Sequence, residues 1–197
     1  MGLSTSQLLY LALIGAVALE RLAEMFISRR NAAWSMERGG VEVGADHFKW
    51  MVLLHTGFLI AAPLEVLLLE RPFLPALGWP MLAAVCGTMA LRYWVIATLG
   101  ERWNTRIVLV PGLGPVTGGP YRWIRHPNYL AVVLELAALP LIHSAWITAA
   151  AFSLANAWML KVRIQAEEAG LREHCGYKEA LGDRPRFMPG GLSNHDR

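Results

Sequence analysis

The chain has 197 residues, of which 55% are hydrophobic and only 17% are charged. A soluble domain usually carries about a quarter charged residues, so this composition argues against an ordinary soluble protein. The net charge is +3, but the basic residues are scattered and form no stripe, which argues against nucleic-acid binding. Cys86 lies in an apolar block and Cys175 in a polar tail, so we expect no disulfide and no metal site.

Five apolar segments follow one another along the chain. A bilayer core of roughly 30 Å needs about 20 largely apolar helical residues. Three segments of that length occupy the N-terminal part, at residues 7–27, 48–69 and 77–99. No basic region or cleavage site precedes the first, so we expect it to remain as a span. Two further segments, 129–142 and 145–161, meet at His143-Ser144, and Pro140 should bend the end of the first of them.

The sequence therefore predicts an all-α fold: an integral membrane helical bundle of about five spans. The last two spans form a C-terminal helical hairpin. We expect a single domain over residues 1–197, with the three N-terminal spans in residues 1–99. Residues 100–197 then supply a Gly- and Pro-rich loop, the hairpin and a charged tail.

The orientation of the bundle follows from its lysines and arginines, which collect on the cytoplasmic side of membrane proteins. With five spans, all eighteen except Arg21, Arg71 and Arg92 fall on one side. Arg21 and Arg92 lie within spans, and Arg71 lies on the opposite side. The N-terminus should be outside, and the 100–127 loop and the tail should share the cytoplasm. A bacterial inner membrane is the expected location, with the active site facing the cytoplasm.

Ionisable residues inside the predicted spans are costly and need partners. Arg21 is spaced to pair with Glu24 across one turn. Glu135 lies about two turns into the fourth helix and has two interpretations. It is either a general base or a structural partner for Arg92 or another buried cation.

Residues 117–130 read TGGPYRWIRHPNYL and join a glycine pair to aromatic and basic residues. Aromatic and arginine residues are also typical of an interfacial membrane anchor. The preceding Gly112-Leu113-Gly114 is no dinucleotide fingerprint, because Pro115 follows it and no strand precedes it. In the fifth helix, Arg163 and Glu167 are one turn apart and are spaced to brace each other.

These motifs together resemble the isoprenylcysteine carboxyl methyltransferase family. The resemblance extends from about Arg102 to Pro189. It rests on Tyr121, on the Arg-His-Pro-Asn-Tyr run at 125–129, on Arg163-Ile164-x-x-Glu167-Glu168, and on a tail with Gly176-Tyr177 and Arg186-Phe187-Met188-Pro189. Phospholipid methyltransferases look similar through the Arg-His-Pro-x-Tyr stretch, so that stretch alone indicates the superfamily and not the acceptor.

The resemblance implies an S-adenosylmethionine-dependent methyltransferase with a cytoplasmic cofactor pocket and no metal. Glu167 should hold the cofactor and Arg163 should meet the acceptor. The other cofactor-binding positions that it implies are Leu113, Gly114, Pro115, Val116, Tyr121, His126, Pro127, Asn128 and Tyr129. The chemistry agrees, because a carboxylate suits ribose hydroxyls and aromatic faces favour a sulfonium cation.

Where the eukaryotic enzymes have an aromatic residue, this chain has Glu135, and its Trp103-Asn104-Thr105-Arg106 run looks like the bacterial branch. That branch often accompanies type III polyketide synthases. We therefore expect O-methylation of an alkylpyrone or alkylresorcinol hydroxyl, with Arg163 and Glu135 as catalytic residues. Such an enzyme would meet a lipophilic small molecule and membrane lipid, and would work beside a polyketide synthase.

Two other acceptors stay open, a prenylcysteine carboxylate and a phospholipid amine. A non-enzymatic transporter or structural membrane protein is a further alternative. Transporters tend to show broken spans in repeated halves, and this sequence shows neither feature.

Overall fold

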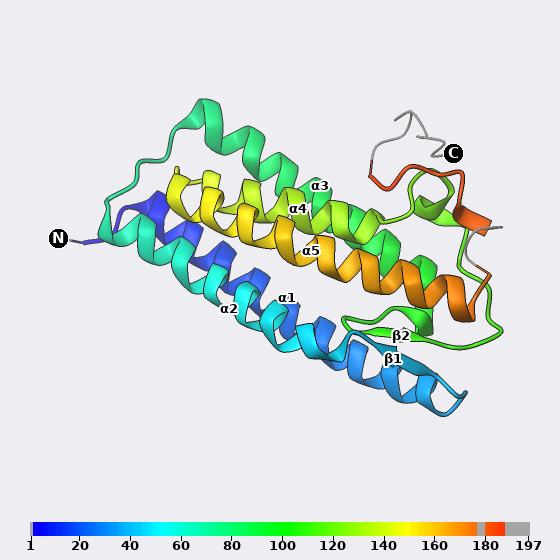
Figure 1. The fold of residues 1–197 in the computed structure, drawn as a ribbon. Coiled ribbons are helices and arrows are strands. Elements are labelled where there is room, and N and C mark those ends of the chain that lie inside the picture. The colour runs from blue at the N-terminus through cyan, green and yellow to red at the C-terminus, as the bar shows by residue number, and fades with distance from the viewer. Residues whose placement is uncertain (1, 177–179, 188–197) are drawn as a thin grey trace.

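The computed structural model describes residues 2–176 and 180–187. Its helices are α1 (Thr5–Met36), α2 (Ala45–Leu68), α3 (Pro75–Leu99), α4 (Pro127–Leu141) and α5 (Trp146–His174), with short 3₁₀ helices η1 (Gly100–Arg102) and η2 (Gly119–Arg122). The helices run roughly alongside one another, so the bundle is elongated (Figure 1). The molecule is mostly helical, as the sequence predicts, and each predicted apolar segment lies, to within one residue, in one of the five α-helices of the described chain.

Local sequence signals explain where several helices begin. Ser4 forms a capping box with Gln7 at the start of α1: each side chain bonds the backbone N–H of the other residue. Pro75 and Pro127 stand in the first turn of α3 and α4, where proline's missing N–H costs nothing. These local signals mark the starts of three helices.

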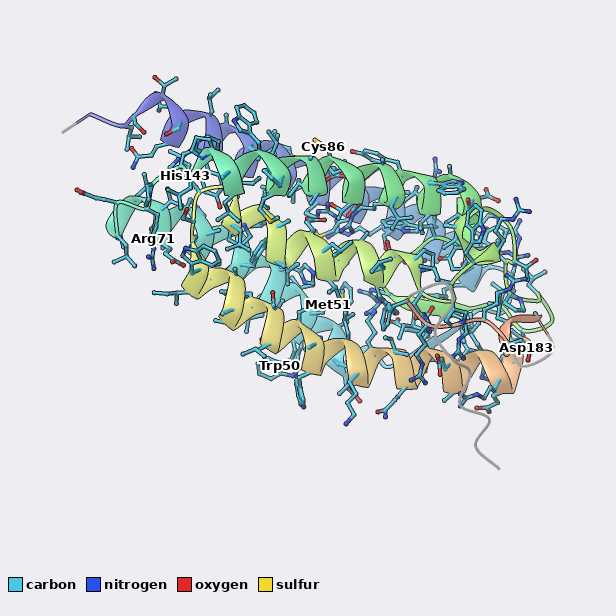
Figure 2. All side chains as sticks on the ribbon, turned by 90° about the horizontal axis from the view of Figure 1, so that it is seen from above. Trp50, Met51, Arg71, Cys86, His143 and Asp183 are labelled. Atoms are coloured by element: carbon cyan, nitrogen blue, oxygen red, sulfur yellow. The ribbon has the colours of Figure 1, made fainter. Side chains whose placement is uncertain are left out.

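The two ends of the bundle differ in character. One end, which we call the turn end, holds residues 69–74 and 142–145, the short connections between successive helices. The other, which we call the loop end, holds residues 100–126 and the described part of the tail (Figure 1). Figure 2 shows Arg71 and His143 at the turn end and Asp183 at the loop end. The chain's polar, irregular segments therefore gather mainly at one end.

A small sheet at the loop end was not predicted from the sequence. β1 (Val41–Val43) pairs antiparallel with β2 (Ile107–Leu109), and Glu42 lies opposite Val108. β1 belongs to the α1–α2 connection, whereas β2 belongs to the loop before α4. The pairing therefore joins the N-terminal helices to the loop that carries the sequence motifs.

Large apolar side chains are exposed on the outside of the bundle. α2 and the continuous stretch Pro75–Arg102 are long and apolar enough to cross a membrane. Exposed apolar side chains also occur on α1 and α5, including Phe26, Leu154 and Trp158. An apolar outer surface of this extent suits lipid rather than water as the surrounding medium.

The interior is apolar along most of its length. Side chains from α1, α2, α3 and α4 meet in one core, represented by Val17, Phe58, Val85 and Leu136. At the turn end, the carboxylate of Glu65 on α2 accepts the backbone N–H groups of Ile147 and Thr148. It also pairs with Arg71 at 2.9 Å. Glu65 thus caps the start of α5 from another helix.

Candidate active site

A cavity of about 850 Å³, its open mouth included, lies at the loop end. Its walls come from η1, the β2 strand, η2, the start of α4 and the last turns of α5. Residues that the sequence singles out line much of it: Pro115, Val116, Tyr121, His126, Asn128, Tyr129, Arg163 and Glu167.

Three residues implied by the resemblance are absent from the lining of this cavity. Pro127 is fully buried at the first position of α4. Gly114 lies in the same loop, and its carbonyl accepts a hydrogen bond of 2.8 Å from Arg102. Leu113 also lies outside the lining. Only the second half of the 113–116 segment therefore reaches the cavity wall.

Tyr129 links the two charged residues of α5 that the sequence singles out. Arg163 donates from Nε to the Tyr129 hydroxyl at 3.0 Å, and that hydroxyl donates to the carboxylate of Glu167. Arg163 also donates to the backbone carbonyl of Thr105. Arg163 and Glu167 are thus linked through the hydroxyl of Tyr129, rather than by the direct ion pair that their spacing suggests. This arrangement fixes the guanidinium and leaves Glu167 only partly buried at the cavity wall.

Tyr121 forms another part of the wall. Burial raises the pKa of its hydroxyl well above the ordinary value, and the charge of Glu167 raises that pKa further. Tyr121 is therefore neutral throughout the physiological range. A neutral ring beside a carboxylate provides a surface that favours a cationic ligand.

Glu168 organises the cationic side chains around the cavity. Its buried carboxylate lies 3.0 Å from Nε2 of His126 and 2.8 Å from Arg186, with Arg172 at 3.2 Å and Arg125 at 3.7 Å. Burial alone would raise the pKa of Glu168, but hydrogen bonds from His126 and Arg186 outweigh it and hold that pKa well below the usual range. An ionised carboxylate can only accept, so Nε2 of His126 must carry hydrogen.

The depressed pKa of Glu168 makes a testable contribution to stability. A carboxylate with a lower pKa in the folded state stabilises the fold above its unfolded value of about 4.3 and loses that effect as pH falls. We expect the melting temperature of the wild type to fall as the pH is lowered from about 5 toward 2, and Glu168→Gln to reduce that fall. Thermal melts in detergent across this range measure it, with Glu173→Gln as the exposed control. An identical pH dependence in wild type and Glu168→Gln would contradict the assignment.

Glu135 lies elsewhere in the bundle. It is buried, and its carboxylate is 2.6 Å from Arg92 and 3.3 Å from Arg21. Arg21 also pairs with Glu24 at 2.6 Å, as its spacing predicts, and with Glu20 at 2.8 Å. These five residues, three acids and two arginines from α1, α3 and α4, form what we call the ion cluster. Glu135 is outside the lining of the cavity, which favours the structural one of its two interpretations.

The cavity also includes residues to which the sequence assigned no function. They include Leu99, Arg102, Ile107, Leu109, Arg125, Leu171 and Leu181. Trp103, Asn104 and Arg106 line it as well, and their motif was the available signal. Asn31 of α1 donates to the carbonyl of Trp103 at 2.8 Å and so holds this motif in place.

Comparison with known proteins identifies the same family that the motifs in the cavity wall resemble. Residues 81–173 match the model of the isoprenylcysteine carboxyl methyltransferase (ICMT) family. The uncharacterized protein YpbQ of Bacillus subtilis is 39% identical over 163 residues, which cover 82% of this chain and 96% of that protein. The chain belongs to the isoprenylcysteine carboxyl methyltransferase family. An uncharacterized protein of Haemophilus influenzae is 27% identical over 152 residues, covering 77% of this chain and 88% of that protein.

Family membership and the two apolar helices identify the chain as a membrane methyltransferase. Methyltransferases of this family generally use S-adenosylmethionine. The matched segment contains most of the cavity wall, from α3 through α4 to the last turns of α5. Tyr177, Met188 and Pro189, which belong to the resemblance, lie outside the described residues.

Proposed function

We propose that this protein transfers a methyl group from S-adenosylmethionine to a lipid-like acceptor, an alkylpyrone or alkylresorcinol hydroxyl. The observation that carries the proposal is the convergence of His126, Tyr129, Arg163 and Glu167 on one cavity. These residues come from two helices and belong to the family's motifs.

The cavity residues fit the proposed cofactor. Glu167 offers carboxylate oxygens for ribose hydroxyls or the cationic end of the methionine portion. Tyr121 and Tyr129 offer neutral aromatic rings, and the side-chain oxygen of Asn128 is buried without a hydrogen-bond partner among the described residues. An unpartnered buried acceptor costs free energy, so a donor supplied by a ligand would stabilise it.

Arg163 is the residue we assign to the acceptor. Its guanidinium is buried and held by Tyr129 and Thr105, so it meets an oxygen in a fixed orientation. A sulfonium supplies an already activated methyl group. The protein therefore needs to align the acceptor oxygen, stabilise its negative charge and exclude water. The acceptor's alkyl chain would extend between the helices into the bilayer.

The position of Glu135 bears on the choice of acceptor. A phenol or enol must lose a proton during transfer, whereas a carboxylate acceptor is already ionised. Because Glu135 is held by Arg92 away from the cavity, we propose that it stabilises the bundle. This favours a second candidate that needs no base, a prenylcysteine carboxylate. With a pyrone or resorcinol acceptor, Arg163 would instead favour ionisation by stabilising the oxyanion.

An acceptor panel tests the proposal and separates its two forms. Purified protein is incubated with methyl-labelled S-adenosylmethionine and an alkylpyrone, an alkylresorcinol, a farnesylcysteine analogue or phosphatidylethanolamine. We expect label transfer to a pyrone or resorcinol oxygen, and loss of transfer in Arg163→Ala. Preference for the farnesylcysteine analogue would select the second candidate, and transfer to the phospholipid amine alone would contradict both.

We also propose a five-span topology with the loop end in the cytoplasm. Its support is the concentration of lysines and arginines at the loop end, together with apolar exposed side chains on α1 and α5 as well as on α2 and α3. A cytoplasmic cavity would meet S-adenosylmethionine where cells make it. The finding that α2 and Pro75–Arg102 qualify as spans is consistent with this arrangement.

Cysteine labelling in intact cells checks this topology. After Cys86 and Cys175 are replaced, a membrane-impermeant reagent should modify a cysteine at position 70, at the turn end, and spare one at position 122, at the loop end. Both positions are exposed in the structure. Opening the cells should make position 122 reactive, which controls for accessibility. Labelling of 122 but not 70 in intact cells would reverse the proposed orientation.

A further inference from the structure

A second hollow lies on α4 and α5, beside the described tail. This groove spans about 770 Å³, with the open solvent at its mouth included. Its apolar walls are Val133 of α4, Leu160 and Ile164 of α5, and Phe187 of the tail, and its polar rim includes Lys161 and Arg186. The groove shares no lining residue with the cavity described above and has two cationic groups at its edge.

The charge of the groove is positive. Lys161 is exposed and pairs with no carboxylate in the described part of the chain. Arg186 pairs with Glu168, yet its side chain is still 49% exposed. Behind the rim, the single carboxylate of Glu168 faces three arginines. A ligand that complements this surface carries at least one negative charge.

The position of the groove along the long axis of the bundle indicates that this ligand is a lipid. Lys161 ends the apolar stretch of α5, and Trp158, 68% exposed, lies one turn earlier. Exposed tryptophans and lysines mark the level of the lipid headgroups. Val133 and Leu160 extend from that level toward the apolar part of the bundle. The groove therefore offers cations where phosphates lie and apolar walls where acyl chains lie.

We propose that this groove binds an anionic phospholipid, with its phosphate between Lys161 and Arg186 and an acyl chain against Val133 and Leu160. The backbone of the tail is tied to the start of α4: the N–H groups of Arg125 and His126 donate to the carbonyls of Pro185 and Arg186 at 2.9 and 3.1 Å. A bound lipid would therefore stabilise the segment that holds His126. Any consequence for catalysis rests on the function proposed above, but the lipid binding itself does not.

Native mass spectrometry of the purified full-length protein tests the site without measuring methyl transfer. Dioleoylphosphatidylglycerol or dioleoylphosphatidylcholine is titrated into detergent micelles, and bound lipid is counted. We expect one phosphatidylglycerol to bind more tightly than phosphatidylcholine. An interfacial lysine contributes about fivefold to binding of anionic lipid, so Lys161→Ala should lose about that factor, and Lys161→Arg should retain binding. Lys49→Ala, which removes the exposed lysine at the start of α2, is the matched control and should leave the affinity unchanged.

Several outcomes would overturn the proposal. Equal affinity for the two lipids would remove the anionic requirement, and equal losses in Lys49→Ala and Lys161→Ala would indicate general surface attraction. Full competition by glycerol phosphate would indicate a headgroup site without an acyl chain. Much tighter lipid binding after deletion of residues 188–197 would show that the protein's own C-terminus occupies the groove. None of these readouts depends on methyltransferase activity, so the two proposals fail independently.

Discussion

Glu167→Ala should weaken binding of S-adenosylhomocysteine by about 100-fold or more while the bundle stays folded. Hydrogen bonds to a charged group contribute roughly 1.5–3 kcal/mol each, and the carboxylate can accept two from a ribose or one end of the amino acid portion. Glu167 is only partly buried, and its described hydrogen bond comes from Tyr129. Its removal therefore costs little packing.

Isothermal titration calorimetry in detergent measures this affinity, and a thermal melt of the same sample reports folding. Glu173→Ala is the matched control, because Glu173 lies on the same helix and its side chain is 76% exposed. We expect Glu173→Ala to bind as the wild type does. Unchanged affinity in Glu167→Ala would show that the cofactor is held elsewhere in the protein.

Glu135→Gln should lower the melting temperature markedly. Breaking a buried ion pair by removing one partner usually costs about 3–5 kcal/mol, since the other charge remains buried. Here Arg92 would lose its closest carboxylate, at 2.6 Å, and Arg21 would lose one of three. Turnover per folded molecule should change little, because Glu135 lies outside the cavity wall.

Melting and turnover must be measured together on this variant. A general base contributes about 100- to 10,000-fold to rate. A loss of that size with an unchanged melting temperature would restore the catalytic interpretation of Glu135. Glu37→Gln serves as the control, because Glu37 makes an exposed ion pair with Arg38 at 3.8 Å, and this variant should affect neither quantity strongly.

The helices were predictable from the sequence because each apolar segment carries its own length and boundary signals. The main difference concerns α1, which continues to Met36, well past residue 27. Buried Ser28 and Asn31 account for the extension, because their side chains form hydrogen bonds with residues of the 100–105 segment rather than facing lipid. β1 and β2 had no comparable signal. Each has three residues, and their pairing depends on contacts between distant parts of the chain.

The site was predictable only to the level of its motifs. His126, Tyr129 and Glu167 meet at the cavity as the resemblance implies, but their links depend on which side chains the fold brings together. Arg92 pairs with Glu135 across 43 positions, and no local pattern could choose between that partner and a catalytic role. Glu168 was recognised as part of a motif, but its three arginines become visible only in three dimensions.

Because of the β1–β2 pairing, the family-matched region of this protein cannot simply be separated from its N-terminal helices. One strand of the cavity wall is completed by a segment from between the first two helices, and Asn31 of α1 secures the Trp103 carbonyl beside it. The family's matched region, taken alone, would lack both supports. A chimera that places residues 81–173 behind foreign membrane helices would therefore need to carry the end of α1 and β1 with it. In this protein the N-terminal helices support the wall of the cavity, beyond any role as a membrane anchor.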